Sequence, residues 1–414
     1  LGNGMHFTLI GLRGGIEGFS AAELSVVTSG YFLGFLSGAR FTPALIRRVG
    51  HVRVFAALGS FMSAGLIAFT LLAEPWAWTV LRVLIGFCMS GIYVAAESWL
   101  NNASTNETRG KVLSAYMIAQ TLGIIGAQAL LTLGDAATAG LFIGASILVS
   151  VSFAPILLSV TPAPAVEVAR PMSLRDLFAG SPLGTVGIFL LGSVYATQSG
   201  MGAVFGSEIG MTATEVALFV AMLFAGALVL QYPIGWLSDR LDRRMVILGA
   251  AVLGAASCAL GWLAGSGLIW PADPGPWPLL AAAFLAGGMT TPLYALLLAY
   301  TNDFLSAEDM PAASGGLVFT FGMGAIFGPL ATGWAMEAAG PFAFWLVLGA
   351  TFLVLALYAL YRMTQRPAAP AEETESYLGV LPTASVVAVE AAGAWAAEQA
   401  ESDESGAEAA PGPD

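Results

Sequence analysis

Two charged residues, Arg82 and Glu97, lie inside one hydrophobic segment of membrane-spanning length, residues 78–102. A charge at bilayer depth costs about 2.5 kcal/mol or more, so it persists only where it faces a polar interior, a cavity or a partner. An arginine there can bind a substrate anion or relay protons, or it can be a structural charge satisfied by carbonyl groups. A carboxylate there can carry a proton, or it can belong to a structural ion pair. The segment therefore points to solute binding and proton transfer.

Helix geometry keeps these two charges apart. The rise over fifteen residues is roughly 22 Å, so Arg82 and Glu97 cannot pair directly. They are separated by only about 60° around the helix axis, so both can line one cavity. Arg40 lies at a depth similar to that of Glu97 in another hydrophobic segment. It can either pair with Glu97 or extend to the nearby membrane surface.

The composition is that of a polytopic membrane protein. Hydrophobic residues make up 57% of the 414 residues and charged residues only 10%, with a mean hydropathy of +0.79. Soluble domains carry about 25% charged residues. The net charge of −12 arises mostly after Arg366, so we expect no nucleic-acid partner. Two isolated cysteines and two histidines predict no disulfide and no metal site. Without a phosphate loop, dinucleotide fingerprint or nucleophile motif, we expect no cofactor and no enzyme activity.

Eleven hydrophobic segments are long enough to cross a bilayer, which takes about 20 residues. An open strand edge is not tolerated in lipid, so each segment is predicted to be a helix. The first segment, residues 1–12, is too short to span, and we expect a first helix that is truncated at its start. The prediction is an all-α membrane protein with twelve transmembrane helices. The eleven full segments are residues 24–46, 53–73, 76–100, 110–133, 138–159, 183–205, 214–237, 244–266, 278–301, 312–335 and 341–361.

Basic residues mark alternate connections between these segments. The opposite connections hold Arg13 alone. Because basic residues favour cytoplasmic loops, the C-terminus and the complete N-terminus are predicted to be cytoplasmic. The basic residues of the predicted cytoplasmic connections and tail are Arg47, Arg48, Arg53, Arg109, Lys111, Arg170, Arg175, Arg240, Arg243, Arg244, Arg362 and Arg366.

The two halves of the chain resemble each other. Residues 18–24, GFSAAEL, align with residues 210–216, GMTATEV, at an offset of 192. Further along, the offset becomes 201, which places Gly86 on Gly287. Two six-helix halves related in parallel are typical of one transporter class. The expected parts are an N-terminal six-helix bundle (1–160), a cytoplasmic linker (161–182) with a short helix at 173–178 capped by its serine, a C-terminal six-helix bundle (183–361) and a disordered acidic tail (362–414).

Several motifs resemble the major facilitator superfamily. Residues 235–244, GWLSDRLDRR, are similar to its signature loop G-x-x-x-D-R-x-G-R-R, with Asp242 where the family prefers glycine. The first-half copy, residues 43–51, keeps the basic residues but lacks the acidic one. Residues 82–86, RVLIG, resemble the R-x-x-x-G motif of the fourth helix. Residues 93–101, YVAAESWLN, with the start LGNG, are similar to the YcaD-type branch of bacterial inner-membrane members.

The resemblance implies a major-facilitator-type fold and a secondary active transporter. It would be a monomer in a bacterial inner membrane, surrounded by the lipid bilayer, that moves a small-molecule substrate coupled to protons by rocking its two bundles. Two alternatives stay open. An acidic, aromatic cavity would favour an exporter of hydrophobic cations or drugs, and a cavity sealed by bulky apolar residues would favour a non-transporting membrane sensor.

The resemblance also implies which residues face the substrate and which form the gate. When the cytoplasmic side closes, Asp239 is expected to contact the start of the fifth helix at Arg109, where the helix end carries a partial positive charge. Each uncharged pathway candidate can instead make an interhelical hydrogen bond, as can Gln128. The expected substrate and proton pathway is Arg82, Glu97, Arg40, His6, Gln120, Tyr195, Gln198 and Tyr294, and the expected gate is Asp239, Arg240, Arg109 and Arg243.

Overall fold

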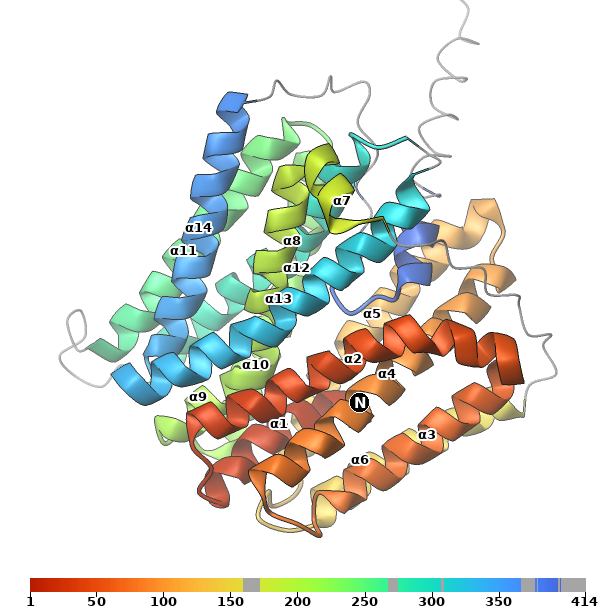
Figure 1. The fold of residues 1–414 in the computed structure, drawn as a ribbon. Helices are drawn as coiled ribbons and strands as arrows, with labels where there is room; N and C mark the ends of the chain where they lie inside the picture. Colours follow the sequence, from red (N-terminus) through yellow and green to blue (C-terminus); the bar gives the residue numbers. More distant parts are fainter. Residues whose placement is uncertain are drawn as a thin grey trace, which may run out of the picture.

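The computed structural model is a bundle of long helices (Figure 1). It describes residues 1–158, 172–266, 275–306, 309–365, 377, 379–393 and 395, and only the backbone of residues 106 and 107. The first half contains α1 (Gly2–Ile16), α2 (Ala21–Val49), α3 (His51–Ala68), α4 (Pro75–Ala103), α5 (Asn106–Leu131) and α6 (Gly140–Leu157). The second half contains α7 (Leu174–Gly180), α8 (Pro182–Ala196), the π-helical turn η1 (Thr197–Met201), α9 (Gly202–Glu208), α10 (Ala213–Ser238), α11 (Arg243–Ser266), α12 (Trp277–Asn302), α13 (Met310–Ala339) and α14 (Ala343–Gln365).

Ten helices in the described part of the chain are long and apolar enough to cross a membrane. They match ten of the eleven predicted segments, with α8, η1 and α9 together forming one continuous span. α2 covers the remaining segment with 29 residues, but serine, threonine, glycine and arginine make it more polar. α1, with 15 residues, is shorter than a span. The all-helical membrane fold is thus confirmed, and the count of twelve stays a prediction.

The short helix predicted in the linker is confirmed. α7 begins after Ser173, whose Oγ accepts a hydrogen bond from the backbone N–H of Asp176 at 3.2 Å. A serine in this position satisfies an N–H group that the first helical turn leaves unpaired. The part of the linker from 159 to 171 lies outside the described residues.

The sequence repeat is confirmed by individual helix contacts. α2 packs along α4, and α10 packs along α12. A side chain at Gly86 would overlap the carbonyl oxygen of Tyr31, and one at Gly287 would overlap that of Leu223. Gly86 and Gly287 are related by the offset of 201, and Tyr31 and Leu223 by the offset of 192. Both halves therefore use a glycine at the same place to bring two helix backbones into contact.

The turns that precede α2 and α10 repeat as well. Ser20 and Glu23 form a capping box at the start of α2, and Thr212 and Glu215 form one at the start of α10. In each capping box the side chain of the cap and that of the third helical residue satisfy each other's backbone N–H. The glycine two residues ahead of each cap has a φ close to +80°, a conformation that other residues rarely adopt.

This packing gives a stability prediction. Gly86→Ala places a methyl group against a backbone carbonyl that cannot rotate away, so we expect a loss of about 1–3 kcal/mol. Gly144→Ala in α6 is the matched control, since a side chain there meets nothing within 4 Å. It should be neutral or stabilising by about 0.5–1 kcal/mol, because alanine favours a helix. Thermal unfolding of the detergent-purified variants measures both, and equal unfolding temperatures would refute the packing argument.

The two halves meet more closely at one end of the molecule than at the other. At the closed end, where α2 begins and α13 ends, Ser29 Oγ donates a hydrogen bond to the carbonyl of Ile326 at 2.8 Å. A side chain at Gly333 would overlap Ser25 there. The basic end is the opposite one, where α2, α4, α10 and α12 end and α5 begins. α1 and α9 also pack together across the halves, as do α5 and α10.

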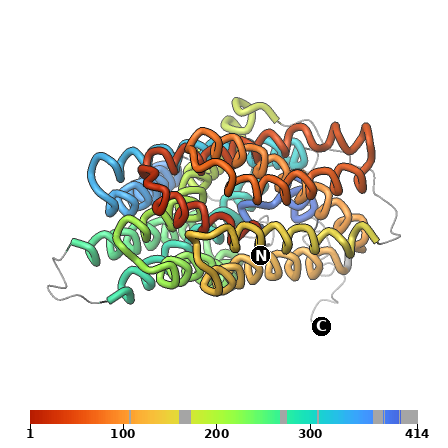
Figure 2. Tube along the Cα trace, turned by 90° about the horizontal axis from the view of Figure 1, so that it is seen from below, coloured from red at the N-terminus to blue at the C-terminus, as the bar shows by residue number. Residues whose placement is uncertain are grey.

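The predicted disorder of the tail is wrong for its described part, which we call the tail segment: Tyr377, residues 379–393 and Trp395. The segment includes a helical stretch at 386–393. It lies between α13 and α5 at the basic end (Figure 1), and the view from below shows it surrounded by helices of both halves (Figure 2). Its apolar side chains join the core of the protein. Packing against both halves explains why this part is ordered although the tail as a whole is acidic.

Candidate substrate cavity and proton site

A small central cavity of about 30 Å³ lies between the two halves. Residues from α1, α2, α4, α5, α8, η1 and α10 line it, and Thr383 of the tail segment closes it toward the basic end. Its surface combines aromatic rings with neutral hydrogen-bonding groups, a pattern typical of sites for small organic molecules. The polar and aromatic lining residues are Asn3, Phe7, Thr8, Tyr31, Phe32, Tyr93, Gln128, Tyr195, Ser199, Phe224 and Thr383.

Arg82 lies beside this cavity rather than in its lining. Its guanidinium carbon is 4.3 Å from the ring centre of Phe7 and 4.7 Å from that of Tyr31. Nη1 is 3.1 Å from Nδ1 of His6, and both residues are completely buried. Phe7 and Tyr31 both line the cavity, so they stand between its space and the charge. Arg82 thus holds two cavity walls together through cation–π contacts.

Glu97 lies further along α4 toward the basic end, with 1% of its surface exposed. Oε1 accepts a hydrogen bond from the hydroxyl of Tyr116 at 2.9 Å, and Oε2 accepts one from the backbone N–H of Ser385 at 2.8 Å. Both partners are neutral, and one of them belongs to the tail segment. A buried carboxylate with neutral partners is a group that can take up and release a proton as its surroundings change.

The ion pair between Arg40 and Glu97, one of the two alternatives for Arg40, does not form. Arg40 is exposed, while Glu97 is buried and uses its oxygens for Tyr116 and Ser385. Equal depth along two helices does not bring side chains together when they point in different directions around the helix axes. The exposed position of Arg40 fits the alternative, in which it extends to the membrane surface.

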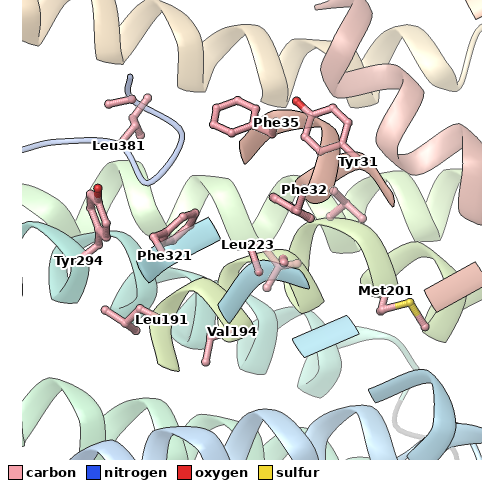
Figure 3. Packing of buried hydrophobic residues seen from close by; sticks show 14 of the residues in the cluster. Tyr31, Phe32, Phe35, Leu191, Val194, Met201, Leu223, Tyr294, Phe321 and Leu381 are labelled. Atoms are coloured by element: carbon pink, nitrogen blue, oxygen red, sulfur yellow. The ribbon is translucent and has the colours of Figure 1, made fainter. Parts of the chain in front are cut away.

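Of the uncharged pathway candidates, some line the central cavity and others contact neighbouring helices. Tyr195 lines the central cavity directly. Gln198, in the π-helical turn, accepts a hydrogen bond from Thr290 Oγ1 at 3.0 Å. Such turns often occur at functional sites. Tyr294 packs edge-on against Phe321, 5.3 Å between ring centres. Figure 3 shows Tyr294 and Phe321 in the buried cluster, with Leu381 of the tail segment on a loop beside them.

Two glutamine side chains of α5 were also considered as pathway or hydrogen-bonding residues. Gln128 accepts a hydrogen bond from Thr8 Oγ1 at 2.9 Å and also lines the cavity. It therefore combines an interhelical hydrogen bond with a place in the cavity wall. Gln120 is half-buried, and its Oε1 has no hydrogen-bond partner among the described residues. Gln120 is one turn from Tyr116, the partner of Glu97, so it lies near Glu97.

The predicted gate residues of the second half lie at the basic end. Asp239 Oδ1 accepts a hydrogen bond from the backbone N–H of Tyr377 at 3.0 Å. The tail segment thus contacts Asp239 where the start of α5 was expected to do so. Arg243 and Asp303 form a buried ion pair at 2.5 Å. Arg240 is exposed, stacks on Trp236 and donates to its carbonyl. The contact between Asp239 and Arg109 stays a prediction, because here the halves are separated at this end.

Asp242 has a local role of its own. It pairs with Arg244, Oδ2 to Nη2 at 2.7 Å, and this hydrogen bond holds the pKa of the Asp242 carboxyl below its usual value. Its φ is not positive, as glycine alone adopts positive values among the described residues. The turn therefore does not need the glycine that the signature loop usually has here.

The sequence argument missed several cavity residues. Phe7, Tyr31 and Phe224 are single aromatic residues in apolar helices, where a core position and a cavity position look alike. Thr383 was missed because the tail was expected to be disordered. Asn3 could have been found, because a polar side chain near the start of an apolar helix needs a partner. It donates to the hydroxyl of Tyr31 at 3.3 Å.

The fold and this cavity agree with the match to a family model. The model described as Major Facilitator Superfamily matches residues 1–205 and 183–397, once for each half. The chain belongs to the Major Facilitator Superfamily. It is therefore a membrane transporter rather than an enzyme, and the family resemblance inferred from its motifs is confirmed.

Relatives and solved structures support the same assignment. The MFS-type transporter YfkF of Bacillus subtilis is 27% identical over 86% of this chain and 91% of its own. YcaD of Escherichia fergusonii, also named an MFS-type transporter, is 23% identical over 80% and 84%. Two crystal structures of the nucleoside transporter NupG superpose with TM-scores of 0.70 and 0.64 at 16% and 15% identity. They cover 86% and 87% of this chain, and 95% and 98% of their own. At such low identity they support the fold alone.

Proposed function

We propose that this superfamily member is a proton-coupled secondary transporter of a small organic solute, with Glu97 as the proton carrier. The observation that carries the proposal is the carboxylate of Glu97, which is buried between the halves and, among the described residues, has Tyr116 and Ser385 as its hydrogen-bond partners. A buried carboxylate that gains and loses a proton can couple the proton gradient to rearrangement of its surroundings.

Alternating access follows from the two ends of the molecule. The halves are in direct contact at the closed end, whereas the tail segment separates them at the basic end. This arrangement corresponds to the conformation open toward the basic end, which we expect to be cytoplasmic. Rocking of the halves would close the basic end and expose the central cavity at the other end.

The cavity favours a neutral or cationic organic solute over an anion. Its lining is aromatic and neutral, Arg82 is held behind Phe7 and Tyr31, and the carboxylate near the cavity is Glu97. Export of hydrophobic cations is therefore the second candidate, since cations bind over aromatic faces. A non-transporting sensor is less compatible with a cavity that retains amide and hydroxyl groups in its wall.

A ligand-stabilisation screen of the full-length purified protein tests this proposal. The probes are a nucleoside such as uridine, a hydrophobic cation such as tetraphenylphosphonium, and a carboxylate such as succinate. We expect uridine or tetraphenylphosphonium to raise the unfolding temperature, because a ligand that binds the native state stabilises it. Stabilisation by succinate alone would overturn the assignment and return Arg82 to the role of anion site.

The gate gives a separate prediction. Asp239→Asn keeps an oxygen that can accept the N–H of Tyr377, but it removes the charge that would meet the start of α5 when the basic end closes. Such a contact is worth about 1–2 kcal/mol, which shifts a balanced equilibrium roughly tenfold. A Ser25→Cys reporter is buried at the closed end and reacts with a maleimide only when that end opens. We expect Asp239→Asn to slow this labelling about tenfold.

The control for the gate is Asp242→Asn, the same change in the same connection at a carboxylate paired with Arg244. It should leave labelling of the Ser25→Cys reporter unchanged. The two native cysteines, Cys88 and Cys258, are fully buried and contribute little background. If Asp239→Asn and Asp242→Asn label at the same rate, Asp239 has no part in closing the basic end.

A further inference from the structure

The tail segment is buried as thoroughly as a transmembrane helix. Leu381 is 9% exposed, Ala384 is 4% exposed and Ala388 is 1% exposed. Most side chains in this part of the segment are small and apolar, with Glu390 as the charged residue between 379 and 393. Burial of this kind removes apolar surface from water at about 25 cal/mol per Å². The tail segment therefore behaves as a bound peptide rather than as a solvated extension.

The tail segment contacts both halves of the transporter. In the first half, the backbone N–H of Ser385 donates to Glu97, and the indole of Trp395 covers Gly110 at the start of α5, where a Cβ would lie 2.6 Å from the ring. In the second half, the backbone N–H of Tyr377 donates to Asp239. Two carboxylates, one from each half, thus hold backbone N–H groups of one peptide.

The fit of the tail segment depends on close approach at glycines. Gly235 on α10 lies under the ring of Tyr377, and a side chain at Gly235 would overlap that ring. Pro382 and Thr383 lie between α2 and α13, where they border a small cavity together with Phe35 and Phe321. Figure 3 shows Leu381 on this loop in the same buried cluster. The site therefore matches the shape of this particular peptide.

We propose that the space between the halves at the basic end is a peptide-binding site whose ligand is the chain's own tail segment, and that the docked segment prevents the basic end from closing. The segment binds Asp239 through the backbone N–H of Tyr377 and covers Gly110 with Trp395, and these two positions are the two sides of the expected gate. It also holds Glu97 and closes the central cavity through Thr383. This goes beyond the proposed function, because binding of the tail can be tested without any transported solute.

Release of the tail is consequently a step that must precede closure. While the segment is docked, the two halves cannot approach each other at the basic end, because its side chains fill the space between them. A groove of about 490 Å³ runs between α5 and α10 beside the segment, lined by Met117, Gln231 and Leu381 among others. The tail therefore works as a brake on the alternation of the transporter.

The first experiment asks whether the segment is docked in the full-length protein. A Leu381→Cys reporter should react slowly with a maleimide, since Leu381 is buried. Adding Ala388→Arg should speed labelling by about tenfold or more, because an arginine cannot fit at a position that is 1% exposed. Ala388→Gly is the control at the same position and should leave the rate within about twofold. Equal rates in all three proteins would overturn docking.

The second experiment asks whether docking prevents alternation. A Cβ at Gly235 would lie 3.1 Å from Cγ of Tyr377, the atom that a cysteine sulfur would replace, so Gly235→Cys with Tyr377→Cys can form a disulfide. The Ser25→Cys reporter at the closed end is added to this pair. We expect oxidation to suppress labelling of the reporter at least about tenfold, and dithiothreitol to restore it.

The comparison between oxidised and reduced forms uses one protein, so a folding defect cannot imitate the result. The control is the reporter with Tyr377→Cys alone, which cannot form the tether and should label equally in both redox states. If the tethered protein labels equally whether oxidised or reduced, the docked tail does not prevent closure and the proposal is wrong. Failure of the ligand screen would remove the proposed function alone, because neither labelling experiment depends on a solute.

Discussion

Glu97→Gln is expected to abolish concentrative transport while leaving solute exchange largely intact. The amide cannot release or take up a proton near neutral pH, so the proton gradient no longer biases the rearrangement. Its oxygen can still accept a hydrogen bond from Tyr116 or Ser385, so the protein should fold and bind solute. Exchange needs only reorientation of the loaded transporter, whereas accumulation needs the proton.

This result is measured in proteoliposomes with the radiolabelled probe that stabilises the purified protein. Counterflow against internal probe should stay within about threefold of the wild type, and accumulation driven by an imposed pH gradient should fall to the level of empty liposomes. Glu23→Gln is the matched control, because either residue completes the capping box with Ser20. Undiminished accumulation by Glu97→Gln would return Glu97 to a structural role.

Asp303→Asn is expected to lower the free energy of unfolding by about 3–5 kcal/mol, because it removes the carboxylate that forms a buried ion pair with Arg243. The side chains of Arg243 and Asp303 are 4% and 2% exposed. The pair joins the start of α11 to the end of α12, so it also keeps the second half rigid where the half must move as one body. Thermal unfolding of the purified protein measures the change.

The matched control is Asp242→Asn, which breaks the ion pair that Asp242 forms with Arg244 in the adjoining turn. The side chain of Asp242 is 32% exposed, and exposed pairs are worth about 0–1 kcal/mol. A loss for Asp303→Asn no larger than that for Asp242→Asn would contradict the assignment of Arg243 and Asp303 as a buried structural pair.

The helical architecture was predictable because its signals are local or repeated. Hydrophobic length predicted the segments, and the register between Gly86 and Gly287 indicated that the two halves repeat one arrangement. Gly86 lies against the backbone carbonyl of Tyr31 in α2, and Gly287 lies against that of Leu223 in α10. A side chain that must be absent leaves a clear trace in the sequence, whereas the direction in which a side chain points does not.

The misjudged features depend on direction and on long-range contact. Arg40 and Glu97 share a depth but not a direction, so the ion pair that was one alternative for Arg40 does not form. Arg82 was expected in the cavity, but its guanidinium lies against the rings of Phe7 and Tyr31, which line the cavity in its place. Neither arrangement can be derived from spacing along one helix, because it depends on which neighbouring helix lies opposite.

The tail was misjudged because its average composition hides an apolar stretch. Acidic residues lie on both sides of residues 379–393, and within this stretch Glu390 alone is charged. The short apolar run could have been noticed, but its position between the halves could not. That position requires the contacts with Glu97 and Asp239, which lie 288 and 138 residues away from their tail partners.

Proton movement driven by a solute gradient tests the central claim most directly. Proteoliposomes containing the full-length protein and an internal pH dye receive the stabilising probe on one side, with no pH gradient imposed. The account predicts that the probe gradient changes the internal pH in the wild type and in Glu23→Gln, and that Glu97→Gln shows no change. Transport of the probe without any pH change, or an unaltered pH change in Glu97→Gln, would contradict Glu97 as the proton carrier.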